Sequence, residues 1–135
     1  MSAQADLRGA IVAALRADAA LTAVIGADRV HDGAPRGAAI PFVDLGAVET
    51  RLLAATPGEG ERHIVEVLAY SRKPARGEVS AVLSAVRDVL AELGPAVGAQ
   101  RLVHVSDPVM RSERQRDGRG WRGRLSVRIV TEPAA

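Results

Sequence analysis

The stretch ERHIVEVLAYS, residues 61–71, decides the fold of this chain because apolar residues occupy both of its faces. At the side-chain period of a β-strand these residues fall into two sets: Val65 and Val67 on one face, and Ile64, Leu68 and Tyr70 on the other. A strand that is apolar on both faces lies in the centre of a sheet, or has one face covered by another subunit. The stretch therefore predicts a central strand, and the remaining elements can be placed outward from it.

Two amphipathic helices are predicted, one before and one after this strand. The first covers residues 4–18, with Ser2 or Asp6 as its cap and residues 21–25 as an apolar extension. The second ends at Gly94-Pro95, a pair that typically terminates a helix. Its apolar stripe has helical spacing and consists of Val79, Val82, Leu83, Val86, Val89, Leu90 and Leu93.

Four further segments have the alternation or the turn boundaries of strands: Val30-His31, Pro41 to Glu49, residues 101–110, and Trp121 to Val130. In the third of these, Pro108 indicates an edge or a bulge. Before the fourth, Asp117-Gly118 predicts a hairpin turn. The segment Thr50 to Gly60 is predicted to be a loop by its Pro-Gly-Glu-Gly ending, and Leu52 and Leu53 lie in it without a periodic partner.

These elements give the order α-β-β-β-α-β-β, an α+β fold with two helices packed on a mostly antiparallel sheet. With 135 residues, the chain is expected to be a single domain, 1–135, that buries its own core. The absence of cysteine excludes disulfides, thiolate metal sites and cysteine nucleophiles. No apolar run reaches the length of a membrane span and no signal peptide is apparent, so we expect a soluble protein made in the cytosol that binds no membrane.

The C-terminal stretch GRGWRGRLSVRIV, residues 118–130, fits the letters of a dinucleotide-binding loop at Gly118, Gly120 and Gly123. Such a loop follows a strand and opens a helix, so that the N-terminus of the helix meets the pyrophosphate. Here the glycines follow a predicted turn and enter a predicted strand. The context favours a hairpin and argues against a bound cofactor.

No catalytic or metal-binding set of residues is predicted. His31, His63 and His104 are far apart in sequence, and none has a second ligand at helical spacing. Ser106-Asp107, beside His104, lacks the turn that a nucleophile needs. We therefore expect strand histidines in polar contacts, no metal, no cofactor and no enzymatic activity.

Arginine accumulates around the predicted hairpin, where seven arginines between Arg111 and Arg128 face only two carboxylates, Glu113 and Asp117. The last strand has the pattern of a half-buried strand, with an apolar face of Trp121, Leu125, Val127 and Ile129. A polar outer face accounts for arginines on the other side, but not for their excess around the turn.

That excess suits an anion, either nucleic-acid phosphate or an acidic protein surface. With three aromatic residues in the whole chain, base stacking is not expected. One function that the residues leave open is therefore a small non-specific nucleic-acid-binding protein that uses the hairpin 111–128. The candidate partner or channel surface consists of Arg111, Arg114, Arg116, Arg119, Arg122 and Arg124.

Beyond these patterns, the segment LRGAIVAALRADAALTAVIGADRVHDGAPRGAAIPFVDLG resembles the opening of the tail completion proteins of tailed phages. That family has a helix, an ADAAL-like segment, a short Val-His/Tyr-Asp strand and then a Pro-Phe/Tyr-Val strand. The resemblance continues through HIVEVLAYSR, VSAVLSAVRDVLAEL and the closing GWRGRLSVRIVTEP. It covers nearly the whole chain, and its short apolar motifs define a fold rather than a catalytic site.

The resemblance implies a structural virion protein, a tail terminator of a phage, a prophage or a phage-like gene transfer agent. Such a protein forms a hexameric ring that caps the tail tube, stops its polymerisation and joins the head connector or stopper protein. DNA would pass through the ring without specific recognition. The protein would be assembled in the host cytoplasm and lie at the head–tail junction. The candidate tail-tube or subunit interface is the loop with Leu52, Leu53, Pro57 and Glu59.

Overall fold

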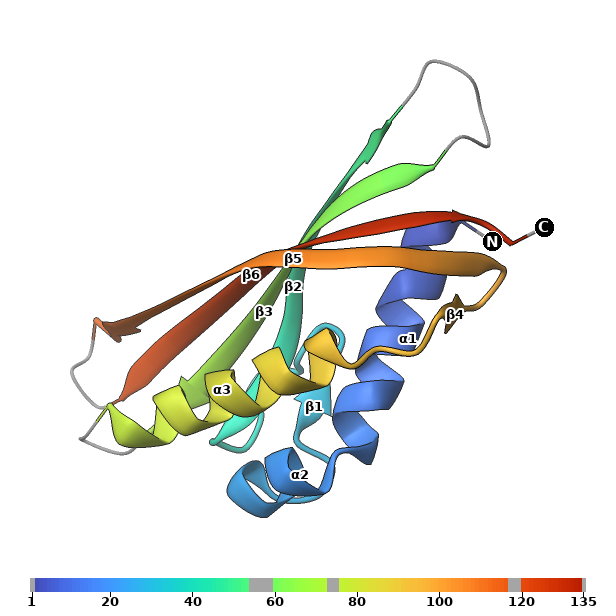
Figure 1. Cartoon of the computed structure of the whole chain (residues 1–135). Coiled ribbons are helices and arrows are strands. Elements are labelled where there is room, and N and C mark those ends of the chain that lie inside the picture. Colours follow the sequence, from blue (N-terminus) through green and yellow to red (C-terminus); the bar gives the residue numbers. More distant parts are fainter. Residues whose placement is uncertain (1, 54–59, 73–75, 117–119, 135) are drawn as a thin grey trace.

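The computed structural model describes residues 2–53, 60–72, 76–116 and 120–134, which form three helices and one six-stranded sheet (Figure 1). The helices are α1 (Ala3–Ala17), α2 (Ala19–Ile25) and α3 (Gly77–Ala91). The strands are β1 (Val30–His31), β2 (Phe42–Leu52), β3 (Glu61–Ser71), β4 (Ala96–Val97), β5 (Gln100–Arg114) and β6 (Trp121–Pro133). Their order in the sheet is β1-β2-β3-β6-β5-β4, and only β1 and β2 pair in parallel. The α+β fold with a mostly antiparallel sheet is confirmed.

The central position of β3 is confirmed, because it pairs along its whole length with both β2 and β6. Its residues Val65 and Val67 are fully buried on the face against which α1 and α3 pack. The other set, Ile64, Leu68 and Tyr70, is half-buried on the opposite face, which those helices leave open. This open face of the sheet is the one available to other molecules.

The predicted pair of helices is wrong for the N-terminal region, where the apolar extension 21–25 belongs to a separate helix, α2. Asp18 separates the two helices because its backbone is extended and ends α1. Its side-chain carboxylate accepts a hydrogen bond from the Leu21 N–H at 2.9 Å and so caps α2. Ser2 caps α1 as predicted, accepting from the Ala5 N–H at 3.1 Å.

The predicted strand order also lacks β4, so the order over the described residues is α-α-β-β-β-α-β-β-β. With two residues, β4 is too short to carry a periodic signal. It is held by the buried carboxylate of Asp6, which accepts a hydrogen bond from the Ala99 N–H at 3.2 Å in the turn before β5. Asp6, predicted as a possible helix cap, therefore fixes a turn at the far end of the sheet instead.

The predicted loop Thr50 to Gly60 is shorter than expected, because β2 continues to Leu52 and pairs with β3 as far as Glu61. A bulge between Leu45 and Val48 moves the following residues to the other face of the strand, and the simple alternation is lost there. The strand predicted from alternation therefore ends at Glu49, whereas β2 continues to Leu52.

The predicted hairpin turn at Asp117-Gly118 lies outside the described residues. On either side of this gap β5 and β6 pair antiparallel, with Glu113 opposite Arg122 and Arg114 opposite Trp121. The predicted irregularity at Pro108 is confirmed by a register shift between Ser106 and Val109.

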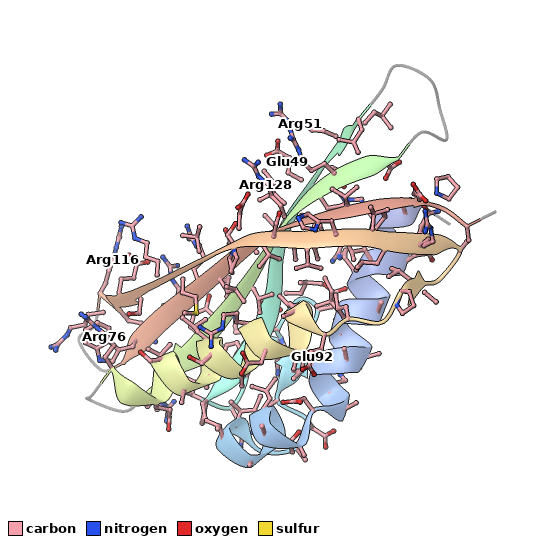
Figure 2. The ribbon with its side chains drawn as sticks, in the orientation of Figure 1. Glu49, Arg51, Arg76, Glu92, Arg116 and Arg128 are labelled. Atoms are coloured by element: carbon pink, nitrogen blue, oxygen red, sulfur yellow. The ribbon has the colours of Figure 1, made fainter. Side chains whose placement is uncertain are left out.

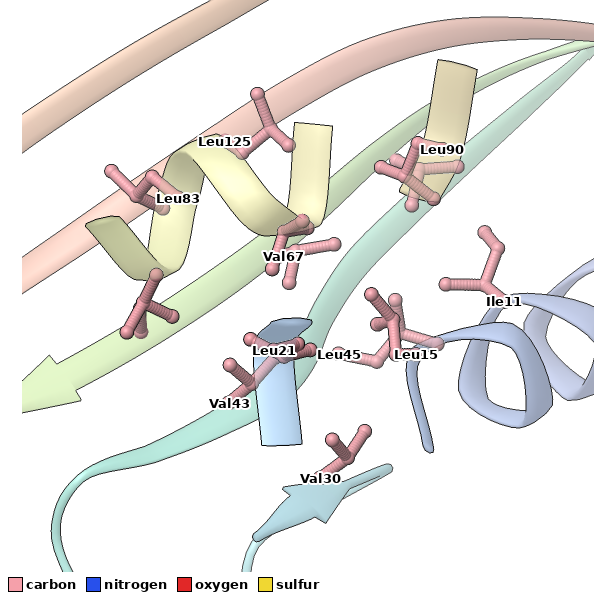
Figure 3. Close-up of a cluster of buried hydrophobic side chains, with 14 of the residues drawn as sticks. Ile11, Leu15, Leu21, Val30, Val43, Leu45, Val67, Leu83, Leu90 and Leu125 are labelled. Carbon is pink, nitrogen blue, oxygen red and sulfur yellow. The ribbon is translucent and has the colours of Figure 1, made fainter. Parts of the chain in front are cut away.

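The core lies between the sheet and the helices, and its side chains come from both (Figure 3). The predicted inner face of β6 is confirmed, since Trp121, Leu125, Val127 and Ile129 are all buried. Gly123 lies directly beneath α3. A Cβ at this position would be 2.7 Å from both Leu83 Cδ1 and Val79 Cγ2, so α3 packs as closely as it does only because residue 123 has no side chain.

Candidate functional site

The four long strands run between two ends of the molecule that differ in chemistry (Figure 1). At one end, which we call the arginine end, β3 and β5 finish and β6 begins. At the other, which we call the apolar end, β2 and β6 finish and β3 and β5 begin. Figure 2 shows Arg76 and Arg116 at the arginine end and Arg51 at the other.

Two adjoining hollows on the sheet form what we call the arginine groove. The larger has a volume of about 430 Å³ and is lined by Tyr70, Glu113, Arg114, Gln115, Arg116 and Arg122. The smaller has a volume of about 200 Å³ and is lined by Arg111, Glu113, Arg122 and Arg124. The groove is therefore built from β3, β5, β6 and the first residues after β5.

Glu113 and Arg122 form the ion pair that joins the two hollows. Arg122 donates to Glu113 Oε1 from Nε at 3.1 Å and also from Nη2. This hydrogen bond lowers the pKa of Glu113, and the charges of Arg122, Arg111 and Arg124 lower it further. Glu113 therefore keeps its negative charge to a lower pH than an unpaired glutamate does.

Trp121, at the start of β6, has two guanidinium groups close to its ring. The Cζ atoms of Arg76 and Arg114 are 4.3 Å and 5.2 Å from the centroid of its ring. Both distances are in the range of cation–π attraction. The contact attaches the start of α3 and the end of β5 to the same buried ring.

The structure gathers five of the six candidate arginines around the arginine groove and leaves Arg119 outside the described residues. Arg111, Arg122 and Arg124 are on the open face of the sheet, whereas Arg114 contacts Trp121. Arg116 lies just beyond β5. Tyr70 and Gln115 also line the groove and were not predicted from the sequence, where Glu113 counted only as an opposing charge. The pairing of Glu113 with Arg122 across β5 and β6 brings them together.

At the apolar end, Leu52 and Leu53 are strongly exposed, at 60% and 50%. Leu53 lies beside Gly60, where an added Cβ would be 3.5 Å from Leu53 Cδ1. A third, open hollow of about 430 Å³ lies at this end, lined by Pro95, Ala96, Gly98, Gln100, Arg101, Glu132, Pro133 and Ala134. Pro57 and Glu59, predicted to share this interface, lie outside the described residues.

Both edges of the sheet are largely open over the described residues. β4 pairs with β5 only at Gln100 and Arg101, and β1 pairs with β2 only at Val43 and Asp44. The open part of β5 carries three exposed apolar side chains: Val103 at 48%, Val109 at 61% and Met110 at 43%. Such an edge is able to pair with another chain.

The three histidines occupy separate places. His31 is in β1 with its ring edge against Phe42, and His104 is exposed on β5. His63 is fully buried, with Nδ1 2.8 Å from Thr50 Oγ1 and Nε2 2.8 Å from Thr131 Oγ1. Burial lowers the pKa of His63, while the nearby Glu61 carboxylate acts in the opposite direction.

In the described ranges the potential metal ligands and the C-terminal glycines are arranged as follows. No three His, Cys, Asp or Glu residues among them are grouped as metal ligands would be. Gly120 and Gly123 lead into β6 and not into a helix, as the sequence context predicted. Among the helices described, none has the length and apolar character that crossing a membrane requires.

The fold and these surfaces define a small α+β domain whose sheet edges are largely open over the described residues and whose two ends differ in chemistry. The chain belongs to the family of the tail completion protein gp17, whose family model matches residues 9–132. Its resemblance to tail completion proteins is thereby confirmed, and the chain is a structural protein of phage-like tails.

A solved structure, described as the virion of a native gene transfer agent (GTA) particle, contains a chain with the same fold. The two chains are 25% identical and superpose with a TM-score of 0.87. The match covers 97% of this chain and 98% of that one. No curated protein matches the chain in sequence.

Proposed function

We propose that this protein is a tail terminator, a virion subunit that forms a ring on the tail tube, stops its polymerisation and joins the tail to the head connector. The observation that carries the proposal is the agreement in fold, over nearly the whole of both chains, with a chain of a GTA virion. Membership of a tail completion family supports the same role. The role needs surfaces for docking and no catalysis.

The two open edges of the sheet support ring formation. The edge of β5 and the edge of β2 are on opposite sides of one sheet, so a contact between them joins unlike surfaces of two copies. A head-to-tail contact of this kind closes into a ring when its rotation is right. We propose a ring of six, through which DNA passes without sequence-specific contacts.

The two ends of the molecule support contacts with different partners. We propose that Leu52 and Leu53, with Pro57 and Glu59, contact the tail tube or the adjacent subunit. Leucines exposed at 60% and 50% on a hairpin end are costly in water and gain from burial in a contact. The arginine end then faces the connector side of the ring.

Deleting the gene from a strain that makes the particles tests the role directly. We expect DNA-filled heads without tails and free tails of uncontrolled length, both restored to normal by a copy of the gene in trans. Electron microscopy of particles carrying a labelled copy should place the label at the head–tail junction. Joined tails of normal length in the deletion strain, or label elsewhere on the particle, would refute the proposal.

A further inference from the structure

The arginine groove holds more positive charge than the described residues neutralise. Five arginines line it, and among the described residues Glu113 is the only carboxylate that lines it with them. That carboxylate is already bonded to Arg122. Glu66, on the neighbouring strand, lies 3.4 Å from Arg124 Nε and offers that side chain one further ion pair. Arg111, Arg114 and Arg116 have no ion pair with any residue in the described ranges.

Two local features indicate that a bound anion would stabilise the arginine groove. The guanidinium groups of Arg76 and Arg114 are both held against the ring of Trp121, so two like charges share one neutral partner. Arg124 Nε lies 3.4 Å from Glu66 Oε2 in an ion pair, but it makes no hydrogen bond of good geometry with a described residue. An added acceptor would reduce the repulsion in the first case and complete the hydrogen bonding in the second.

We propose that the arginine groove binds the carboxylate side chains of an acidic polypeptide segment. The planar fork of arginine matches a carboxylate in two parallel hydrogen bonds, and several forks around one hollow select a segment with neighbouring acids. The proposal rests on the proposed function only for the source of the segment, which would be a neighbouring virion protein.

The shape and the charge pattern favour a polypeptide over nucleic acid. Hollows of about 430 and 200 Å³ admit a few protruding side chains, whereas the broad backbone of a duplex would rest on the rim. Glu113 and Glu66 stand among the arginines and divide the positive surface into separate patches, which suits individual carboxylates better than a continuous row of phosphates. With a net charge of only +2, the whole chain also provides little long-range attraction for DNA.

A peptide of six glutamates with blocked ends is a suitable probe for the full-length chain. Trp121 is the only tryptophan, and its contact with Arg114 makes its fluorescence sensitive to binding. The test variant is Arg111→Gln with Arg116→Gln, both exposed on the groove. The matched control is Arg51→Gln with Arg101→Gln, which removes the same charge from the apolar end, where both side chains are exposed. Circular dichroism checks that both variants fold.

We expect the peptide to bind at low salt and its affinity to fall by about tenfold or more in the groove variant, because two charge-assisted contacts are lost. The control should stay within about twofold of the unmodified chain. Absence of peptide binding at low salt, or an equal loss in both variants, overturns the proposal. So does tighter binding of a short DNA duplex that depends on the same two arginines, which would make the groove a nucleic-acid site.

The result separates this inference from the proposed function. If the gene deletion leaves normal joined tails while the purified chain binds the peptide through the groove, the terminator role fails and the groove assignment stands. If the deletion abolishes joining but the peptide does not bind, the groove assignment fails alone.

Discussion

Replacing Gly123 with alanine tests whether α3 rests directly on β6. The new Cβ would be 2.7 Å from Leu83 Cδ1 and Val79 Cγ2, and both of these side chains are buried, at 3% and 0% exposure. Neither can turn away without displacing other core atoms, and overpacking of this kind costs about 1–3 kcal/mol. The alanine regains about 0.4–1 kcal/mol by restricting the unfolded chain. We therefore expect a net loss of about 1–2 kcal/mol, or about 3–8 °C in Tm.

Gly9→Ala is the matched control, because Gly9 is exposed in α1 and nothing lies within 4 Å of its missing Cβ. The same chemical change should there raise stability by about 0.5–1 kcal/mol, the usual gain of alanine over glycine in a helix. Urea unfolding, followed through the fluorescence of Trp121 and at a concentration where the chain is monomeric, measures both variants. The slope with urea should stay unchanged, since neither variant alters the surface exposed on unfolding.

A double variant identifies the contact itself. Leu83→Ala alone should cost about 2–5 kcal/mol, but it also removes one of the two side chains that Cβ would strike, while Val79 stays. In the Leu83→Ala background, Gly123→Ala should therefore cost at least about 0.5 kcal/mol less than it does alone. If Gly123→Ala is neutral or stabilising, or if the two substitutions are simply additive, the close packing of α3 on β6 is not what the structure indicates.

Three further predictions follow from the caps, the buried histidine and the open edge. Asp18→Ala removes the cap of α2 and should lower the free energy of unfolding by about 1 kcal/mol in urea titrations. Burial lowers the pKa of His63 below 6.5, so the unfolded chain takes up this proton first. The free energy of unfolding should fall as the pH drops below about 6.5 and be independent of His63 above that pH. In urea titrations at several pH values, His63→Gln should reduce this dependence of the free energy on pH. Val109→Lys with Met110→Lys should prevent ring formation through the β5 edge, as measured by light scattering after size-exclusion chromatography. The control Val24→Lys on α2 should leave ring formation unchanged. An intact ring in the β5 variant would show that this edge is not the subunit interface.

Sequence periodicity predicted the elements in which the apolar pattern continues without interruption. The two apolar faces of residues 61–71 placed β3 in the centre of the sheet, and the face of β6 followed from alternation alone. The method failed where one residue interrupts the pattern. Asp18 ends one helix and caps the next within a continuous apolar run, and the bulge after Leu45 reverses the alternation of β2.

The candidate arginines show a different limit. Composition identified the cluster, but it could not assign Arg111 to the open face of the sheet and Arg114 to the ring of Trp121. That division depends on the register of the β5–β6 hairpin. Arg76 could not have been joined to the cluster from local sequence, because its position depends on how α3 packs across the sheet.

The irregularity at Asp107 and Pro108 affects how readily the free edge of β5 pairs with another strand. A fifteen-residue strand with a free edge is the kind of surface that grows into fibres. Here the register shift after Ser106, the left-handed backbone of Asp107 (φ 53°) and the missing N–H of Pro108 divide that edge into two short pieces. A stray strand can pair with only one piece at a time. We therefore expect this break to limit unwanted pairing along β5, so that an edge contact forms only where further contacts with the partner add to it.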